Sequence, residues 1–326
     1  MNANGTTILV TGGAGFIGSH VCEALLARGD RIRVLDNFND FYDPAIKRGN
    51  AKLLEAAGAE VIEGDIRDEA LLDRLLVDEA PDAVIHLAAM AGVRPSLLDP
   101  LHYEDVNVRA TLLMLERLKT RPDTRFVFAS SSSVYGANEK APFSERDDIH
   151  RPISPYAATK RAGELHCFTY HHLYGIPTSC LRFFTVYGPR QRPEMAIHKF
   201  VRMTLAREPI PVFGDGSTRR DYTFVDDIVD GVVKALDHCA GYEIYNLGES
   251  DTISLAEMIE EVGRACGVEP IIDRQGMQPG DVVITYADVS KAKERLGYAP
   301  STDIRTGITK FVEWYRGPEG PGAASA

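Results

Sequence analysis

The strongest constraint on the fold lies near the start of the chain, where the apolar run 7–11 leads into a glycine-rich turn, TGGAGFIG, over residues 11–18. A helix is expected to follow, from Ser19 to Arg28. The glycines permit a tight turn, close approach of a phosphate group to the backbone, and close packing of helix on strand. The pattern predicts the first unit of a dinucleotide-binding fold, and the turn residues expected to contact the ligand are Gly12, Gly15, Phe16, Ile17 and Gly18.

The next apolar run, over residues 31–36, ends in an acid, Asp36, 24 residues after Gly12. A carboxylate at about this spacing accepts hydrogen bonds from the hydroxyls of an adenosine ribose and repels a 2′-phosphate. Asn37 follows, and no arginine comes directly after it. We therefore expect NAD and not NADP, with Asp36 and Asn37 in contact with it. The alternative is a surface aspartate that caps a loop.

Composition agrees with an α/β enzyme and argues against two other classes. The 326 residues are 44% hydrophobic and 25% charged, and the formal net charge of −11 comes with no basic patch for nucleic acid. No segment approaches 18 consecutive apolar residues, and the N-terminus runs into the first strand without a signal peptide, so we expect no membrane association. The five scattered cysteines indicate reduced thiols and a cytoplasmic protein.

Strand and helix patterns alternate over the first 180 residues, which predicts a Rossmann-type, doubly wound parallel sheet. The expected strands are 7–11, 31–36, 59–63, 82–87, 124–130 and 177–182. Ligands of such folds collect at the carboxyl ends of the strands. The cofactor residues expected there, after the third and fourth strands, are Asp65, Ile66, Leu87, Ala88 and Ala89.

The regular alternation fades beyond residue 183, where proline and glycine become frequent. We expect an NAD-binding domain over 1–182 that carries the catalytic residues. A smaller, irregular substrate-binding lobe is expected mainly over 183–316, with the chain crossing back between the lobes. The tail 317–326 is rich in glycine and alanine and is expected to be disordered.

A second group of residues is expected to carry out the reaction. Tyr156 and Lys160 lie four residues apart at the start of a predicted helix, 155–174, and so share one face. An ammonium held near a phenol favours the phenolate and lowers its pKa. Hydroxyls at the end of the fifth strand, Ser130–Ser133, can meet a substrate oxygen. Taken singly, an exposed helical pair and a serine-rich turn are the alternatives.

Five motifs now make a resemblance specific. The chain resembles extended short-chain dehydrogenases/reductases of the NAD-dependent nucleotide-sugar epimerase/dehydratase family over residues 5–315. The resemblance implies that Tyr156 is the base, that Lys160 binds the nicotinamide ribose, and that Ser131 and Ser133 hold the sugar hydroxyl. It rests on TGGAGFIG at 11–18, HLAA at 86–89, SSSVYG at 131–136, YAATK at 156–160 and RFFTVYGP at 182–189.

The residues before Val134 separate branches of this family. Dehydratases of this type carry an Asp-Glu pair where this chain has Ser132 and Ser133, and UDP-glucuronate decarboxylases carry Glu at the position of Ser133. Neither acid is present. Epimerases carry Ser or Thr at these positions, so the chain resembles the epimerases, in which a sugar C4 hydroxyl is oxidised to a ketone and then reduced on the other face.

The segment 187–196 resembles the branch that acts on UDP-glucuronic acid, as does the segment that includes Arg94. A uronate needs a cation or hydroxyl donors for its C6 carboxylate. Our candidates are Arg192 with Thr185, together with Ser131–Ser133. The alternative for Arg192 is pairing with a surface acid or with pyrophosphate.

The nucleotide half of the substrate is expected in the second lobe. The family resemblance implies that Val212 and Phe213 lie on a uracil-binding strand, that Arg220 meets the diphosphate, and that Asp281 lies near the uridine ribose. Many relatives have Arg where this chain has Gln278, which leaves a second diphosphate cation in doubt.

These observations predict an NAD-dependent C4 epimerase of a UDP-sugar that interconverts UDP-glucuronate and UDP-galacturonate, with no metal. The alternatives are a UDP-glucose/UDP-galactose 4-epimerase, a UDP-glucuronate decarboxylase, and an NAD-sensing module with a silent site. Helices over 101–119 and 155–174 resemble the pair that forms dimers in this family, so we expect a homodimer.

Overall fold

The computed structural model describes residues 5–276 and 284–322. A seven-stranded sheet forms the larger lobe, and every pairing within it is parallel. In spatial order the strands are β11 (Tyr242–Leu247), β6 (Thr178–Phe183), β5 (Arg125–Ser131), β4 (Ala83–His86), β1 (Thr7–Thr11), β2 (Arg31–Asp36) and β3 (Glu60–Glu63).

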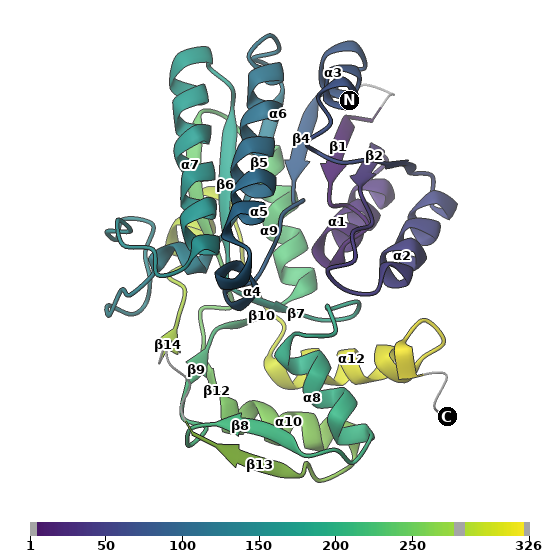
Figure 1. The fold of residues 1–326 in the computed structure, drawn as a ribbon, viewed down its shortest axis with the longest axis vertical. Coiled ribbons are helices and arrows are strands. Elements are labelled where there is room, and N and C mark those ends of the chain that lie inside the picture. Colours follow the sequence, from purple (N-terminus) through teal and green to yellow (C-terminus); the bar gives the residue numbers. More distant parts are fainter. Residues whose placement is uncertain (1–4, 277–283, 323–326) are drawn as a thin grey trace.

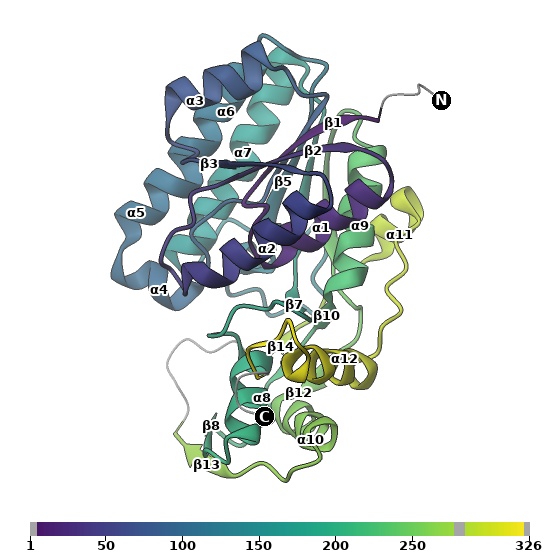
Figure 2. The ribbon, with the colours of Figure 1, turned by 90° about the vertical axis from the view of Figure 1, so that its right-hand side faces the viewer.

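Helices cover both faces of this sheet (Figures 1 and 2). One face carries α1 (Phe16–Ala27), α2 (Pro44–Ala56), α9 (Val225–Asp237) and α11 (Ser290–Leu296). The other carries α3 (Glu69–Asp73), η1 (Arg74–Asp78), α5 (Pro100–Glu104), η2 (Asp105–Arg109), α6 (Ala110–Leu118) and α7 (Pro155–Tyr174).

The expected Rossmann-type sheet is confirmed, and its first six strands agree with the sequence prediction to within one residue at each end. Strand order reverses between β1 and β4, which pair directly. Loops that leave these two strands diverge there and open a crevice at their carboxyl ends. The seventh strand, β11, comes from the part of the chain assigned to the second lobe.

The glycine turn after β1 has a conformation that requires glycine. Gly12 has φ +69°, and a Cβ there would lie 2.7 Å from the backbone nitrogen of Ala88. A Cβ on Gly18 would collide with the backbone of Gly12, so this glycine lets α1 approach the turn. The helix begins at Phe16, three residues before the predicted start.

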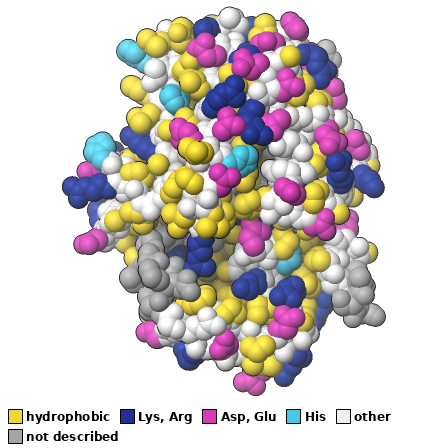
Figure 3. Space-filling model, viewed as in Figure 1, with side chains coloured by type: hydrophobic (Ala, Val, Ile, Leu, Met, Phe, Trp, Pro, Cys, Tyr) yellow, Lys and Arg dark blue, Asp and Glu magenta, His cyan; other side chains and the backbone are white. Residues whose placement is uncertain are grey.

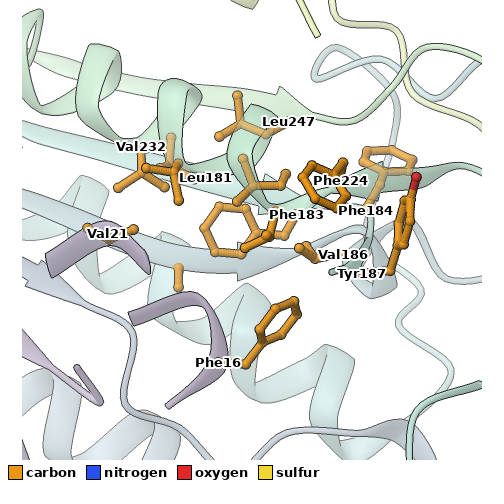
Figure 4. Packing of buried hydrophobic residues seen from close by; sticks show 14 of the residues in the cluster. Phe16, Val21, Leu181, Phe183, Phe184, Val186, Tyr187, Phe224, Val232 and Leu247 are labelled. Atoms are coloured by element: carbon orange, nitrogen blue, oxygen red, sulfur yellow. The ribbon is translucent and has the colours of Figure 1, made fainter. Parts of the chain in front are cut away.

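The main hydrophobic cluster joins the sheet to the second lobe (Figure 4). Val21 on α1 and Val232 on α9 pack on one face of the sheet, and the aromatic run Phe183–Phe184 continues from β6 toward β7 (Thr185–Tyr187). Each residue labelled in Figure 4 has at most 9% of its surface exposed. The core is therefore continuous between the lobes and fixes the strand ends relative to the smaller lobe.

The smaller lobe lies below the carboxyl ends of the strands in Figure 1 and is built from short pieces. Its strands pair as β7 with β10 (Tyr222–Phe224), β9 (Arg219–Arg220) with β12 (Ile253–Ser254) and β14 (Ile284–Thr285), and β8 (Ile210–Phe213) with β13 (Ile272–Gln275). Its helices are α8 (Ala196–Leu205), α10 (Leu255–Cys266) and α12 (Ile304–Arg316). A further short helix, α4 (Val93–Leu98), and the 3-10 turn η3 (Ser132–Tyr135) follow β4 and β5.

The first part of the C-terminal tail is ordered, contrary to the expectation of disorder. Residues 317–322, the first part of the tail expected to be disordered, form turns on the end of α12, where the backbone N–H of Gly317 donates to Glu313 and Trp314. All five cysteines are buried and unbridged. No helix within 5–276 or 284–322 is long and apolar enough to cross a membrane.

Candidate active site

A cavity of ≈ 390 Å³ lies at the strand-order reversal, between the two lobes. Figure 3 shows that this face of the molecule is hollowed between the larger lobe above and the smaller lobe below. The cavity brings together residues from many separate segments of the chain. The expected site residues on its wall are Gly12, Gly15, Phe16, Ile17, Gly18, Asp36, Asn37, Ile66, Leu87, Ala88, Ala89, Ser131, Ser132, Ser133, Tyr156, Lys160, Thr185 and Arg192.

At the cofactor end, the turn after β1 presents the N-terminus of α1 to the cavity. Gly15 precedes the helix and makes no side-chain cap, so the first N–H groups of α1 are available to an anion. Asp36 ends β2, has 6% of its surface exposed, and accepts a hydrogen bond from the backbone N–H of Phe38 at 2.9 Å. This wall fits the pyrophosphate and ribose of a dinucleotide.

Lys47 is a cavity residue that sequence reasoning missed. Its Nζ lies 3.7 Å from Asp36 and donates to Asn39 at 2.9 Å. Burial lowers the pKa of Lys47, while the charge of Asp36 acts in the opposite direction. Lys47 lies 11 residues after Asp36 in a different element, α2, and no motif spacing connects the two.

Asp65 does not lie on the cavity wall, although its neighbours Gly64 and Ile66 do. Both of its carboxylate oxygens accept hydrogen bonds from Arg67, at 2.9 and 2.8 Å, and one also accepts from Asn37. The bonds from Arg67 hold the pKa of Asp65 well below its usual range. The expected contact between Asp65 and the cofactor stays a prediction.

The end of β4 is fixed by a buried histidine. His86 Nδ1 lies 2.7 Å from the hydroxyl of Thr11, and its Nε2 lies 3.0 Å from the hydroxyl of Thr111. Burial and the nearby charge of Lys160 lower the pKa of His86 to about 3, so the ring is neutral. Leu87–Ala89, which follow this histidine directly, line the cavity. Among the described residues, no cluster of three or more His, Cys, Asp or Glu side chains is arranged to hold a metal ion.

The catalytic candidates meet at the end of β5. Ser131 caps η3: its hydroxyl accepts from the backbone N–H of Ser133 at 3.2 Å and donates to the Ser133 hydroxyl at 3.2 Å. Helix α7 begins at Pro155, where the Ser154 hydroxyl accepts from the backbone N–H of Ala157 at 3.1 Å. Tyr156 lies in this first turn and is hydrogen-bonded to Ser131.

The expected effect of Lys160 on the phenol is not what the structure shows. Burial raises the pKa of Tyr156, and the opposing influences are the hydrogen bond with Ser131 and the charge of Arg192. Lys160 instead donates to the carbonyl of Ala129 at 2.8 Å, and burial lowers its pKa to about 8. The cause is that the lysine side chain turns toward β5 and not along the helix toward Tyr156.

At the sugar end, Thr185 opens β7 and Arg192 lies in the loop before α8. Arg192 Nε lies 3.0 Å from the exposed carboxylate of Glu194, so the alternative of pairing with a surface acid is present in the structure. Its guanidinium also lies 5.5 Å from the centroid of the Phe41 ring. Its charge acts on Tyr156, so this cation faces the reacting end of the cavity. Phe41 also lines the wall and was missed, because it belongs to the loop after Asp36.

Four further substrate candidates, Arg94, Val212, Phe213 and Arg220, lie outside this cavity wall. Val212 is 3% exposed and packs in the main core, while Phe213 lies 6.0 Å from the guanidinium of Arg94, so β8 faces α4 across the lobes. Arg220, on β9, donates to the carbonyl of Arg219 at 2.8 Å. Asp281 and Gln278 lie outside the described residues.

Comparison with known proteins agrees with this geometry. The family model described as GDP-mannose 4,6 dehydratase matches residues 9–311. UDP-glucuronate 4-epimerase 4 of Arabidopsis thaliana is 44% identical over 330 residues, which cover 96% of this chain and 76% of the relative.

Two solved structures are also similar. UDP-glucuronic acid 4-epimerase from Bacillus cereus, in complex with UDP-glucuronic acid and NAD, has a TM-score of 0.89 at 37% identity and covers 95% of this chain and 99% of its own. UDP-glucose 4-epimerase from Thermotoga maritima, with UDP-glucose, has a TM-score of 0.87 at 32% identity and covers 95% and 98%. With its parallel sheet, glycine turn and Ser-Tyr-Lys constellation, the chain belongs to the nucleotide-sugar epimerase/dehydratase family that this model describes.

Proposed function

We propose that this protein is an NAD-dependent 4-epimerase of UDP-sugars and that its substrates are UDP-glucuronate and UDP-galacturonate. The observation that carries the choice of sugar is the position of Arg192, a cation on the same cavity wall as Tyr156, Ser131 and Thr185. A guanidinium forms strong, often bidentate hydrogen bonds with a carboxylate. A neutral hexose gives such a cation no partner of this kind.

Different residues of the cavity wall would bind NAD and transfer the proton. The glycine turn, Asp36 and Lys160 would hold NAD, which supplies a hydride acceptor at the sugar C4 when bound. Tyr156 removes the proton from the C4 hydroxyl and later returns it, while Ser131 and Ser133 donate hydrogen bonds to the same oxygen. Because the 4-keto sugar has two faces, turning it within the cavity before reduction inverts C4.

The uronate poses a chemical problem that Arg192 and Thr185 are suited to solve. The 4-keto uronate is a β-keto acid, which loses CO₂ when the C5–C6 bond aligns with the carbonyl π system. A carboxylate gripped by a guanidinium and a hydroxyl is held in one orientation and can be kept out of that alignment. Loss of CO₂ leaves an enolate that must be protonated at C5, and neither Arg192 nor Thr185 supplies that proton, so the grip holds the carboxylate without promoting decarboxylation.

The test compares Arg192→Ala with Arg305→Ala, which removes an exposed arginine of α12 that pairs with Glu261. We expect Arg192→Ala to raise KM for UDP-glucuronate by about 10- to 100-fold, because a charge-assisted hydrogen bond is lost. Arg305→Ala should behave as wild type. An unchanged KM in Arg192→Ala would contradict the assigned role and favour the neutral-sugar alternative.

The remaining site assignments belong to the same proposal. Arg220 and Asp281 would bind the diphosphate and the uridine ribose, and β8 would lie beside the uracil. NAD would then be bound mainly by residues 1–182 and the UDP-sugar mainly by residues 183–316. Five buried, unbridged thiols support a reducing, cytoplasmic location.

We also infer a homodimer, formed through the face that carries the helices over residues 101–119 and 155–174 together with the neighbouring α4. Hydrophobic side chains gather on this face in Figure 3, and those of Leu98, Leu101 and Leu173 have 89%, 81% and 60% of their surface exposed. Exposed apolar patches of this kind mark protein contacts. Light scattering should give a mass twice the 35.9 kDa of one chain, and a mass of one chain would contradict the dimer.

A further inference from the structure

A buried carboxylate lies on the same face of α7 as the two catalytic candidates. Tyr156, Lys160 and Glu164 follow one another at four-residue spacing, so each lies about one turn beyond the last. The Glu164 side chain is 0% exposed. Burial of a charge is costly unless the charge is paired and hydrogen-bonded, so this position needs an explanation.

Three neighbours pair with Glu164. Arg182 on β6 donates from Nε to Oε1 at 2.8 Å and from Nη2 to Oε2 at 2.9 Å. Arg161 donates to Oε2 at 3.0 Å, and the hydroxyl of Ser130 on β5 donates to Oε1 at 2.6 Å. Burial raises the pKa of Glu164, but the hydrogen bonds and charge of Arg182 outweigh it and hold the pKa below its ordinary value. The group is therefore a charged, fully bonded anchor.

This anchor ties α7 to the end of β5 at two adjacent residues. Lys160 donates to the carbonyl of Ala129, and Glu164 accepts from the hydroxyl of Ser130, the next residue along the strand. Ser131 follows directly and is the residue hydrogen-bonded to Tyr156. The two ties thus lie immediately behind the contact between strand and helix on which proton transfer depends.

The same network continues to the turn that carries the serines. Arg182 pairs with Ser130 in the β5–β6 register, and its Nη1 donates to the hydroxyl of Tyr135 at 3.1 Å. Tyr135 ends η3, the turn of Ser132 and Ser133, and its hydroxyl donates to Asn246 at 2.6 Å. One buried arginine therefore fixes both α7, through Glu164, and η3, through Tyr135.

We propose that Glu164, held by Arg182 and linked to β5 through Ser130, is a positioning residue that sets the separation between Tyr156 and Ser131. The proposal rests on the proposed function, in which these two residues serve proton transfer. General acid–base transfer needs heavy atoms within about 2.6–3.2 Å of each other. A displacement of about 1 Å can cost about 100-fold in rate, so a tie that controls this spacing has a kinetic signature.

The most selective variant is Ser130→Ala, because it cuts the link to β5 and leaves the Glu164–Arg182 pair intact. We expect kcat for UDP-glucuronate to fall by about 10-fold or more while KM changes by less than about twofold. Weakening of the Ser131 hydrogen bond raises the pKa of Tyr156, so the acid limb of the kcat profile should move to higher pH. Ser130→Thr, which keeps the hydroxyl, should restore both.

The matched control is Ser179→Ala on β6. This serine is also buried, at 2% exposure, and its hydroxyl donates to the carbonyl of Ala235 at 3.4 Å on the other side of the sheet from α7. It should lose stability without a shift in the pH profile. Equal kcat and equal profiles for Ser130→Ala and wild type would overturn the proposal, as would an equal loss of kcat in both alanine variants.

A second variant and the wild-type enzyme complete the experiment. If Ser130→Ala does not fold, Tyr135→Phe removes the hydroxyl at the other end of the network and should shift the acid limb in the same direction. An unshifted limb in that variant would overturn the proposal. Wild-type enzyme is assayed alongside: its failure to epimerise UDP-glucuronate would contradict the proposed function, whereas normal wild-type turnover with unaffected variants would contradict only the positioning role.

Discussion

At the scale of single residues, burial of Tyr156 opposes its ionisation, and neighbouring groups favour it. Tyr156 lies in a cavity that raises its pKa, and the groups that counter this are the hydroxyl of Ser131 and the charge of Arg192. Lys160, the expected partner, contacts β5 instead. Base strength at Tyr156 therefore depends on two residues of the cavity wall that are also proposed to bind the sugar, which would couple proton transfer to sugar binding.

This coupling predicts the behaviour of Ser131→Ala. Loss of its hydrogen bond raises the pKa of Tyr156, so less phenolate is present at a given pH and the acid limb of the kcat profile moves upward. We expect kcat at pH 7 to fall by about 10- to 100-fold. Measurement of kcat from pH 6 to pH 10 checks this, and an acid limb that stays in place would contradict the pKa assignment.

At the scale of elements, the sequence predicted those features that depend only on residues close together in the chain. Apolar runs located the first six strands, and the glycine pattern located the turn after β1, because both reflect short-range geometry. Lys47 and Phe41 were missed because only the folded loop after β2 brings them to the cavity. Strands of two residues, such as β9 and β12, carry no periodicity that sequence can reveal.

The serine that caps the start of α7 is a local feature that also affects the position of Tyr156. Ser154 caps the turn that carries Tyr156, so Ser154→Ala should cost about 1 kcal/mol of stability and also lower kcat. Ser254→Ala removes the equivalent cap from α10 and should cost a similar amount without affecting kcat. Urea unfolding and initial rates measure the two effects. Equal kcat in both variants would mean that the cap does not position Tyr156.

At the scale of the whole molecule, acidic groups gather where the chain passes from β11 into the smaller lobe. The Asp221 carboxylate is buried and accepts from the backbone N–H groups of Glu249, Ser250 and Ala287 at 2.8, 3.2 and 3.1 Å. Burial raises the pKa of Asp221 to about 6. Burial and the charges of Asp227 and Asp221 raise that of Glu249 to about 8.

These raised pKa values make stability fall as pH rises. Folded protein keeps a proton on Glu249 up to about pH 8, whereas the ordinary value is 4.5, so stability is lost across that window. Glu249→Gln should therefore raise Tm at pH 8, by about 2 °C for about 1 kcal/mol after solvent screening, and leave Tm at pH 4 unchanged. Glu260→Gln, an exposed change on α10, serves as control. An equal Tm for Glu249→Gln and wild type at pH 8 would contradict this account.

The most direct test of the central claim is a time course of anomeric-proton NMR spectra. Purified protein is incubated with UDP-glucuronate and no added NAD. The account predicts that UDP-galacturonate appears, because the reaction returns NAD to its starting state and a tightly held cofactor suffices. A UDP-pentose product would mean that Arg192 and Thr185 do not prevent loss of CO₂. Turnover of UDP-glucose alone, with or without added NAD, would contradict the assignment of a uronate.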